Sequence, residues 1–435
     1  MADQSDARPD RPYGFETRAV HAGAGPDPTT GARNVPIFQT TSYVFEDVDH
    51  AASLFNLQDF GYVYSRLGNP TVSALEERVA SLEGGRGAVA AASGHAAQLL
   101  AFFTIMEPGD EFVASRNLYG GSITQFTHSF RKFGWKVSFV DPTDPENFRR
   151  AITPKTKAIF LEVLANPGGL VVDIEPVARI AHEAGILLMV DNTMASPYLL
   201  RPFEWGADIV IHSTTKFLSG HGTSMGGMVV ESGRFDWASN AEKYPSMTKP
   251  DPAYHGLSFA ETFGDFGFTM KTRAVGLRDL GPTMAPMNAF MTLTGIETLH
   301  LRMERHCANA LTVARFLENH PAVAWVSYAG LETSPSRALA KKYLPRGCGS
   351  VFTFGLKGGF DAGVKVVEGV ELLSHLANVG DTRSLIIHPA STTHRQLTAE
   401  QQVRAGAGPD VIRLSIGIES VDDIVADLDH ALAKS

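Results

Sequence analysis

The chain has 435 residues, more than one compact hydrophobic core usually holds, so two or more domains are expected. Its 47 acidic and 38 basic residues give a net charge of −9, which argues against a nucleic-acid-binding or membrane-surface protein. The polar N-terminus has no signal-peptide core, and only two cysteines, Cys307 and Cys348, are present, so a disulfide framework is excluded and a cytoplasmic location is favoured.

Residues 1–70 predict an N-terminal arm rather than a domain, because glycines and prolines recur throughout residues 13–70. The pattern changes at residue 71. Leu75, Val79 and Leu82 recur at helical spacing, and Pro70 suits a helix start. We therefore predict a helix over residues 71–82, which ends at Gly84.

Short apolar runs then alternate with helical patterns up to residue 285. The predicted strands are 88–92, 111–114, 137–140, 158–163, 186–190, 209–212 and 228–230, and the predicted helices are 96–106, 121–133, 174–184 and 198–205. This alternation predicts an α/β domain over residues 71–285, with a mostly parallel sheet that binds ligands beyond the carboxyl ends of its strands. Residues 87–106 are uncharged, but Ser93 and Gly94 divide them, which favours a strand, a turn and a helix over a membrane span.

Residues 286–435 predict a smaller, C-terminal α+β domain. It combines a long helical stretch over 289–317, interrupted only at Gly295, with strands at 323–328, 351–356 and 411–416 and helices at 364–372 and 421–433. Between the last predicted strand of the large domain and the domain boundary, residues 232–268 are rich in glycine, proline and aromatic residues. Their composition suits either a loop over a site entrance or packing at a subunit contact.

Two neighbouring strands end in side chains suited to catalysis. Asp191 ends one apolar strand, where it is either a turn or cap residue or a carboxylate that faces a protonated ring nitrogen. The next strand runs into Ser213, Thr215 and Lys216, and the two hydroxyls lie on one face of an extended segment, where they could bind one phosphate. A lone lysine is usually solvated, but an amine in a desolvated pocket has a lowered pKa and attacks aldehydes.

A third segment, Ser93-Gly94-His95, joins a small-residue strand to a helix. Glycine lets the backbone approach an anion, and the first helical amides point at it. Such junctions are common, and His95 alone is more often structural than catalytic. With Asp191 and Lys216, however, the segment supplies the phosphate cradle, ring partner and amine that pyridoxal phosphate (PLP) requires.

Other candidates follow neighbouring strands. Tyr119 could stack on a flat ring, Asn166 could bind a ring hydroxyl, and Thr193 is grouped with the cofactor-binding residues. Arg413 lies in an apolar strand. Its position is equally consistent with binding an amino-acid carboxylate and with forming an internal salt bridge. The fifteen histidines show no ligand spacing, so no metal site is predicted.

The chain resembles the Cys/Met-metabolism family of PLP enzymes, a fold-type I transferase group that holds cystathionine synthases and lyases, methionine γ-lyase and homoserine sulfhydrylases. The resemblance begins near Phe15 and reaches the C-terminus. The motifs that carry it are residues 17–23, 39–45, 64–66, 69–71, 216–217, 388–394 and 413–415.

The resemblance implies roles for these residues. Lys216 would be the Schiff-base lysine and proton shuttle, Asp191 would pair with the pyridine nitrogen and Tyr119 would stack on the ring. The phosphate would be held by Gly94, the His95 backbone, Ser213 and Thr215. Tyr64 and Arg66 would reach the cofactor phosphate of a neighbouring subunit, which implies an obligate dimer, typically within a homotetramer. The substrate would be bound by Arg413 and Tyr64, together with the backbone near Asn378.

The sulfhydrylase branch is favoured within the family by residues 378–381 and 392–394. His95 departs from the family pattern by replacing the more usual glutamine or methionine, but a contact through its backbone should survive this change. Gly121 replaces a cysteine typical of methionine-type γ-lyases, which disfavours a lyase. We therefore expect γ-replacement on O-acetyl-L-homoserine, with sulfide or methanethiol as the nucleophile and homocysteine or methionine as the product. The alternatives are an O-succinylhomoserine substrate, cystathionine synthesis from cysteine and γ-elimination. A PLP-binding relative without turnover is disfavoured because Lys216, Asp191 and Arg413 are all present. A hydride-transfer enzyme is disfavoured because no GxGxxG motif follows a first strand.

Overall fold

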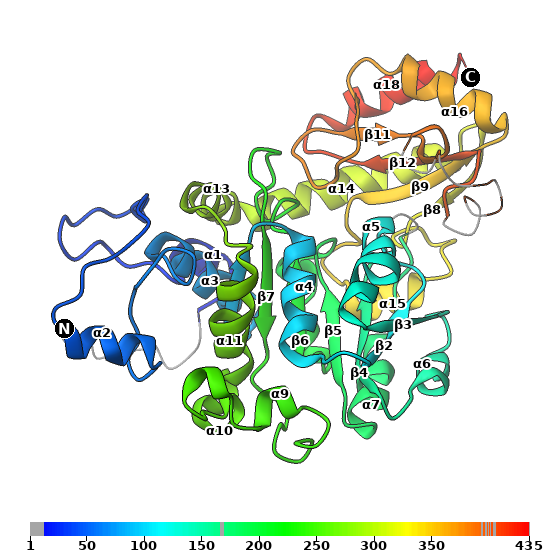
Figure 1. The fold of residues 1–435 in the computed structure, drawn as a ribbon. Coiled ribbons are helices and arrows are strands. Elements are labelled where there is room, and N and C mark those ends of the chain that lie inside the picture. The colour runs from blue at the N-terminus through cyan, green and yellow to red at the C-terminus, as the bar shows by residue number, and fades with distance from the viewer. Residues whose placement is uncertain are drawn as a thin grey trace.

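The chain forms two sheets in a computed structural model that describes residues 13–165, 169–392, 395, 398, 400, 402 and 406–434. A seven-stranded sheet occupies the first half of the chain and a five-stranded sheet the second half. Figure 1 shows the smaller sheet at the carboxyl side of the larger one, with helices around both. This is the mixed α/β architecture predicted from the sequence, with a large, mostly parallel sheet.

The strand order of the large sheet is β1-β7-β6-β5-β4-β2-β3. Its strands are β1 (Gly87–Ala91), β2 (Glu111–Ser115), β3 (Lys136–Val140), β4 (Thr156–Glu162), β5 (Leu187–Asp191), β6 (Ile209–His212) and β7 (Gly227–Glu231). Only β7 runs antiparallel to its neighbours, β1 and β6. The carboxyl ends of β4, β5 and β6 therefore meet at one edge, and Glu162 lies in register with Asp191.

Both faces of every strand except the edge strand β3 are buried, which explains the unbroken apolar runs in these strands. Alternate side chains point to opposite faces. Ile159 and Leu161 belong to one core, with helices α3 (Pro70–Glu83) and α7 (Ile174–Glu183). Ala158 and Phe160 belong to the other core, with helix α4 (Gly94–Ile105) and a group of aromatic rings.

Helix α3 begins and ends where the sequence predicted. Pro70 occupies the first turn, and the side chain of Asn69 accepts a hydrogen bond from the amide of Thr71. Gly84 ends the helix at φ 77°, a left-handed conformation that suits glycine. Leu75, Val79 and Leu82 are fully buried, as their spacing indicated.

Two predicted helices are interrupted. Residues 121–133 form α5 (Gly120–Thr124), a π-helical turn η1 (Gln125–Ser129) and a 3-10 turn η2 (Phe130–Phe133). Residues 198–205 divide into α8 (Ser196–Leu199) and η3 (Pro202–Trp205), because a proline cannot continue the hydrogen-bond ladder of the preceding helix.

The long helical stretch breaks at Thr298 rather than at Gly295, where the sequence analysis placed the interruption. Helix α13 (Pro286–Glu297) ends there, and α14 (Leu299–Glu318) continues toward the second sheet (Figure 1). Gly295 lies inside α13. A Cβ at this position would lie 2.2 Å from the carbonyl oxygen of Ser219, so the glycine allows close backbone packing and does not break the helix.

The second sheet has the order β10-β11-β12-β9-β8. Its strands are β8 (Val323–Ser327), β9 (Val351–Leu356), β10 (Ser374–His375), β11 (Leu385–Ile387) and β12 (Val411–Ser415), and helices α16 (Gly359–Gly369) and α18 (Val421–Leu432) pack together beside it. The sequence predicted β8, β9 and β12. It missed β10, β11 and helix α15 (Arg337–Tyr343), which are too short for a clear periodic pattern.

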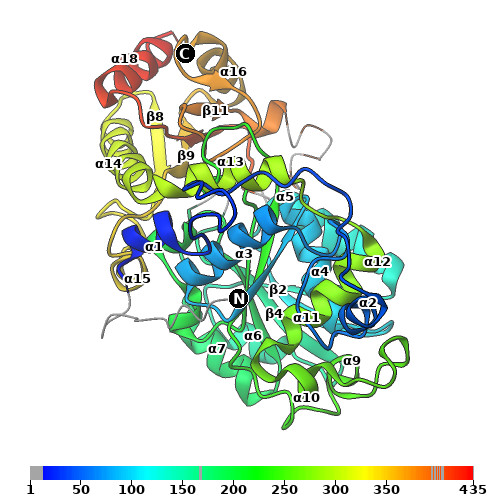
Figure 2. The ribbon, with the colours of Figure 1, turned by 90° about the vertical axis from the view of Figure 1, so that its left-hand side faces the viewer.

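Residues 13–70 contain two short helices, α1 (Phe15–His21) and α2 (Val48–Phe55). Figure 2 shows α1 beside α3, while the segment around α2 curves over the surface near α11 (Gly267–Lys271). Several of its apolar side chains are exposed: Val44, Val48, Phe55, Phe60 and Tyr64. In the described part of the chain, no helix is long and apolar enough to cross a membrane.

Residues 232–268 pack on the α4 side of the large sheet. Trp237, Tyr244 and Phe259 are buried in the aromatic core, and the hydroxyl of Tyr244 donates to the carbonyl of Lys157. None of these residues lines the cavity at the carboxyl edge of the sheet. Of the two interpretations of this segment, the loop over a site entrance is therefore not supported.

Candidate active site

A cavity of about 540 Å³ lies where the carboxyl ends of the large-sheet strands face the second sheet. Its lining combines residues from several strand ends with residues from the second sheet and its loops. They are Ser93, Gly94, His95, Gln98, Tyr119, Glu162, Asp191, Thr193, Met194, Ser213, Thr215, Lys216, Gly222, Thr223, Ser224, Met225, Ala377, Asn378, Val379 and Arg413. All but three of the predicted site residues therefore meet in one place.

One end of the cavity is built to receive an anion. Ser93 caps α4 by accepting a hydrogen bond from the amide of Ala96, so the first amides of this twelve-residue helix face the cavity with the positive end of its dipole. A Cβ on Gly94 would lie 2.8 Å from the Cβ of Ser213, so only glycine permits this approach. Ser213 and Thr215 line the cavity beside these amides.

Asp191 ends β5 with its carboxylate held by two donors. Its Oδ1 accepts a hydrogen bond from the amide of Thr193 at 3.0 Å, and its Oδ2 accepts one from Nε2 of Gln98 at 3.2 Å. Thr193 also accepts a hydrogen bond from the amide of Ser213 at 2.8 Å, which ties the ends of β5 and β6 together. The two donors fix the orientation of the carboxylate at the cavity, where it is suited to face a cationic group.

Lys216 follows β6 and is half-buried, with its amine donating to Oδ1 of Asn378. Burial, followed by the positive charge of Arg413, lowers the pKa of Lys216 to about 8. A substantial fraction of the amine is therefore neutral near physiological pH, as nucleophilic attack and proton transfer require.

Arg413 reaches the cavity from the middle of β12, which pairs with β9 and β11. Its Nη2 donates to the carbonyl oxygen of Asn378 at 3.2 Å. Burial lowers the pKa of Arg413, which remains a cation in proteins. The side chain therefore brings a planar positive group to the wall opposite the large sheet.

Tyr119 and His95 present two rings to the cavity. Their centroids are 5.8 Å apart and their planes differ by 28°. The amide of Tyr119 donates to Oε1 of buried Glu162 at 2.7 Å, which fixes the start of α5. A Cβ on Gly121 would lie 2.4 Å from the Tyr119 ring and 2.9 Å from that of His95, so this pair of rings depends on glycine.

Comparison with known proteins gives the family. A sequence profile of the family described as "Cys/Met metabolism PLP-dependent enzyme" matches residues 16–433. The chain belongs to this family. Among its relatives, O-acetyl-L-homoserine sulfhydrylase of Leptospira meyeri is 54% identical over 96% of both chains, and homocysteine synthase of Schizosaccharomyces pombe is 49% identical over 96% of this chain and 98% of its own.

A solved structure shows the same fold. The putative O-acetylhomoserine (thiol)-lyase of Campylobacter jejuni superposes with a TM-score of 0.94, at 40% identity, over 97% of this chain and 100% of its own. That structure carries a pyridoxyl-lysine monophosphate residue. Together with the family assignment, it establishes PLP as the cofactor and fold type I as the fold of this Cys/Met-metabolism enzyme.

The cavity fits this cofactor on its own geometry. The α4 amides, opened by Gly94, suit a phosphate, and the doubly held carboxylate of Asp191 suits a protonated pyridine nitrogen. The amine of Lys216, with its lowered pKa, suits an aldehyde. Each of these groups comes from a different strand end.

Two of the predicted residues lie elsewhere. Tyr64 and Arg66 are exposed on the arm, where the Arg66 guanidinium lies 5.7 Å from the Tyr64 ring and donates to the carbonyl of Arg278. Neither residue lines the cavity of its own chain. Asn166 lies outside the described residues, as does part of the 392–394 motif.

Sequence reasoning missed two polar residues in the wall, Gln98 and Glu162. Both are buried, with 3% of each residue exposed. Glu162 ends β4 just as Asp191 ends β5, so the strand-end rule could have found it. Gln98 lies one helical turn after Gly94 on α4. A polar side chain in this largely apolar helix is a sequence signal that could have identified it as a site residue.

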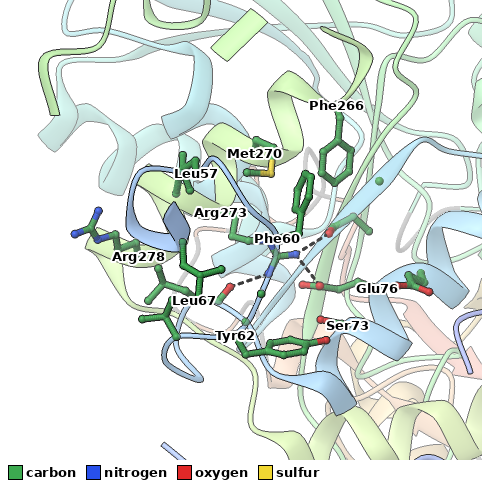
Figure 3. A pocket seen from close by; sticks show the side chains of 18 of the residues that line it. Leu57, Phe60, Tyr62, Leu67, Ser73, Glu76, Phe266, Met270, Arg273 and Arg278 are labelled. Atoms are coloured by element: carbon green, nitrogen blue, oxygen red, sulfur yellow. Dashed lines mark hydrogen bonds and ion pairs between the residues drawn. The ribbon is translucent and has the colours of Figure 1, made fainter. Parts of the chain in front are cut away.

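A second cavity, of about 760 Å³, lies under the arm and away from this cluster. Figure 3 shows Tyr62 and Leu67 of the arm on one side of it and Phe266 and Met270 on the other, with the Phe60 ring beside that of Phe266. Arg273 lines this second cavity and donates hydrogen bonds to the carbonyl of Leu67, the carboxylate of Glu76 and the carbonyl of Ala88. Arg273 thus fastens the arm to α3 and β1.

Proposed function

We propose that this enzyme exchanges the acetoxy group of O-acetyl-L-homoserine for sulfide, giving L-homocysteine and acetate, and that methanethiol can replace sulfide to give methionine. The observation that carries the proposal is the meeting of Lys216, Asp191 and Arg413 in one cavity of a Cys/Met-metabolism fold. Relatives named O-acetyl-L-homoserine sulfhydrylase or homocysteine synthase cover nearly the whole chain, which favours this reaction over the alternatives.

Lys216 is the proposed cofactor lysine and proton carrier. When bound, PLP serves as an electron sink that stabilises negative charge on the substrate carbon skeleton. The neutral amine of Lys216 takes a proton from the α-carbon and moves protons at the β-carbon, because one flexible side chain reaches both atoms. Its pKa of about 8 suits both the acceptance and the return of a proton.

Other residues hold the cofactor in this proposal. Asp191 would keep the pyridine nitrogen protonated and Tyr119 would stack on the ring. Asn166, which lies outside the described residues, would bind the ring hydroxyl. The amides of Gly94 and His95 and the hydroxyls of Ser213 and Thr215 would hold the phosphate. Thr193 supports Asp191 and Ser213 from the same edge.

Arg413 binds the α-carboxylate of the substrate in this proposal, with Asn378 beside it. A guanidinium and a carboxylate form two parallel hydrogen bonds, which fix the orientation as well as the position of the substrate. Lys216 donates to the Asn378 side chain, and Arg413 donates to the Asn378 backbone. The substrate carboxylate is thus anchored next to the amine that moves its protons.

The charges in the cavity wall favour an acetyl over a succinyl ester. The Lys and Arg side chains in its described lining are Lys216 and Arg413, and both already have roles. A succinyl group would bring a second carboxylate, and the described lining offers it no further cation. An acetyl ester ends in an uncharged methyl group, which needs no further cation. Met194 and Met225 offer this methyl group an apolar surface.

A second copy of the chain completes the site in this proposal. Tyr64 and Arg66 project from the arm, outside their own cavity, beside exposed apolar side chains such as Val44 and Phe60. Burial of these side chains against a partner would place Tyr64 and Arg66 at the partner's phosphate site, within a dimer or a dimer of dimers. The two cysteines are free and buried, which suits a cytoplasmic enzyme.

Product analysis tests the reaction. Purified enzyme with PLP and O-acetyl-L-homoserine should form homocysteine and acetate when sulfide is added, and little 2-oxobutyrate without sulfide. Fast 2-oxobutyrate release without sulfide would identify a γ-lyase instead. A higher kcat/KM for O-succinyl-L-homoserine would overturn the choice of acyl group, and cystathionine formation in preference to homocysteine would overturn the choice of nucleophile.

A further inference from the structure

Gln98 is a buried polar residue that none of the roles above includes. It lies on α4, one turn after Gly94, and only 3% of it is exposed. Its neighbours Ala97, Leu100 and Ala101 are fully buried and apolar. Burial of an amide in such surroundings costs free energy unless the amide is hydrogen-bonded.

The amide of Gln98 makes two hydrogen bonds through the same nitrogen. Nε2 donates to Oδ2 of Asp191 at 3.2 Å and to Oγ of Ser122 at 3.0 Å. An ionised carboxylate can only accept, so the nitrogen rather than the oxygen of the amide faces Asp191. Ser122 lies on α5, which begins directly after Tyr119.

The oxygen of the same amide is not used. Oε1 is buried and has no hydrogen-bond partner among the described residues. An apolar side chain of similar size would avoid this unsatisfied acceptor. The geometry therefore indicates that glutamine serves here through its two N–H groups and not through its volume.

We propose that Gln98 is a positioning residue that holds the Asp191 carboxylate in place and directs it at the cofactor ring. The inference rests on the proposed role of Asp191. A single amide then links three parts of the site: the helix that receives the phosphate, the carboxylate that faces the ring nitrogen and the helix that follows the stacking tyrosine. Without Gln98, the Thr193 amide is the one donor to Asp191 left among the described residues, and the carboxylate gains rotational freedom.

The test is cofactor affinity, measured by titrating PLP into apo-enzyme. Gln98→Leu removes both donors and should raise the Kd for PLP about tenfold or more, the effect of losing a hydrogen bond to a charged group. Gln98→Glu retains the size, places a second carboxylate against Asp191 and should weaken binding further. In both variants, the visible absorbance of the bound cofactor should report a less protonated ring nitrogen.

Thr104→Val is the matched control. Thr104 is buried on the same helix and bonds Thr272, but it does not line the cavity. The control variant should lose thermal stability and keep the wild-type Kd and spectrum. If Gln98→Leu does not fold, Gln98→Met, which is unbranched like glutamine, makes the same comparison.

A wild-type Kd and spectrum in a folded Gln98→Leu or Gln98→Met variant would overturn the inference. That result is distinct from failure of the proposed function. If the function is wrong, the wild-type enzyme itself forms no homocysteine. If only this inference is wrong, the wild-type enzyme is active and the Gln98 variants match it.

Discussion

At the scale of single residues, the site depends on an amine whose charge is set by its surroundings. Lys216 is partly removed from water and lies near the guanidinium of Arg413, and both effects disfavour its protonated form. The same guanidinium is placed to bind the substrate. One cation therefore tunes the catalytic amine and anchors the carboxylate.

The amine of Lys216 is essential in this account. Lys216→Ala should lower kcat by several orders of magnitude, because no other side chain carries the protons. The variant should still bind PLP non-covalently, since Asp191 and the α4 amides remain. Steady-state assays and equilibrium dialysis measure the two properties, and near-wild-type turnover by Lys216→Ala would refute the assignment.

Cofactor uptake should depend on pH through the same amine. Because the neutral form attacks the aldehyde, the rate of PLP capture by apo-enzyme should rise with pH to a midpoint near the lowered pKa of about 8. Arg413→Leu removes a nearby positive charge, which raises the pKa of Lys216 and moves the midpoint to higher pH. Arg413→Lys retains the charge and should leave the midpoint close to that of the wild-type enzyme. Stopped-flow absorbance measures these rates, and an unchanged midpoint in Arg413→Leu would contradict the electrostatic argument.

At the scale of elements, the site is made by strand ends and by the start of one helix. Strands β4, β5 and β6 deliver Glu162, Asp191 and Ser213 to the same edge of the sheet. Helix α4 turns its amides toward that edge, and Gly94 permits the close approach. The catalytic geometry therefore follows from the parallel sheet and one glycine.

Gly94→Ala tests the helix start. The added Cβ would lie 2.8 Å from the Cβ of Ser213 and 3.1 Å from its Cα, so either β6 or α4 must shift. Overpacking of this kind costs about 1–3 kcal/mol, which should appear as weaker PLP binding. Gly25→Ala is the control, because nothing lies within 4 Å of its Cβ position. Equal PLP affinity in Gly94→Ala and Gly25→Ala would argue against an anion site at this helix.

The sequence predicts these elements better than their interruptions. Apolar runs and turn residues located every strand of the large sheet, and their carboxyl ends located Asp191, Lys216 and Ser213. The break at Thr298 and the short strand β11 depend on tertiary packing, which leaves no local pattern. The polar side chain of Gln98 in a largely apolar helix is a local signal, but only the fold reveals that its amide reaches Asp191.

At the scale of the whole molecule, the site lies between two sheets. In this account, the arm of a partner subunit completes it. The large sheet supplies the cofactor-binding groups, and the second sheet supplies Arg413. Tyr64 and Arg66 remain at a distance in the single chain, fastened to the core by contacts such as the one between Arg273 and Leu67 (Figure 3). The proposed partner subunit accounts for both their exposure and their position.

Mixed oligomers test this arrangement. Lys216→Ala and Arg66→Ala subunits should each be poorly active alone, because the first lacks the amine and the second lacks the arm side chain that its partner needs. When the two are co-expressed, some sites combine an intact Lys216 with an intact Arg66 from the other subunit, and activity should return. Activity no greater than the sum of the two separate variants would show that Arg66 serves its own subunit or none.

The attachment site of the cofactor is the most direct test of the account. Holoenzyme is reduced with borohydride, digested and examined by mass spectrometry for peptides that carry a phosphopyridoxyl group. The account predicts that this group is found on Lys216 alone. A modified lysine elsewhere in the chain, or none in an enzyme that binds PLP and turns over, would contradict it.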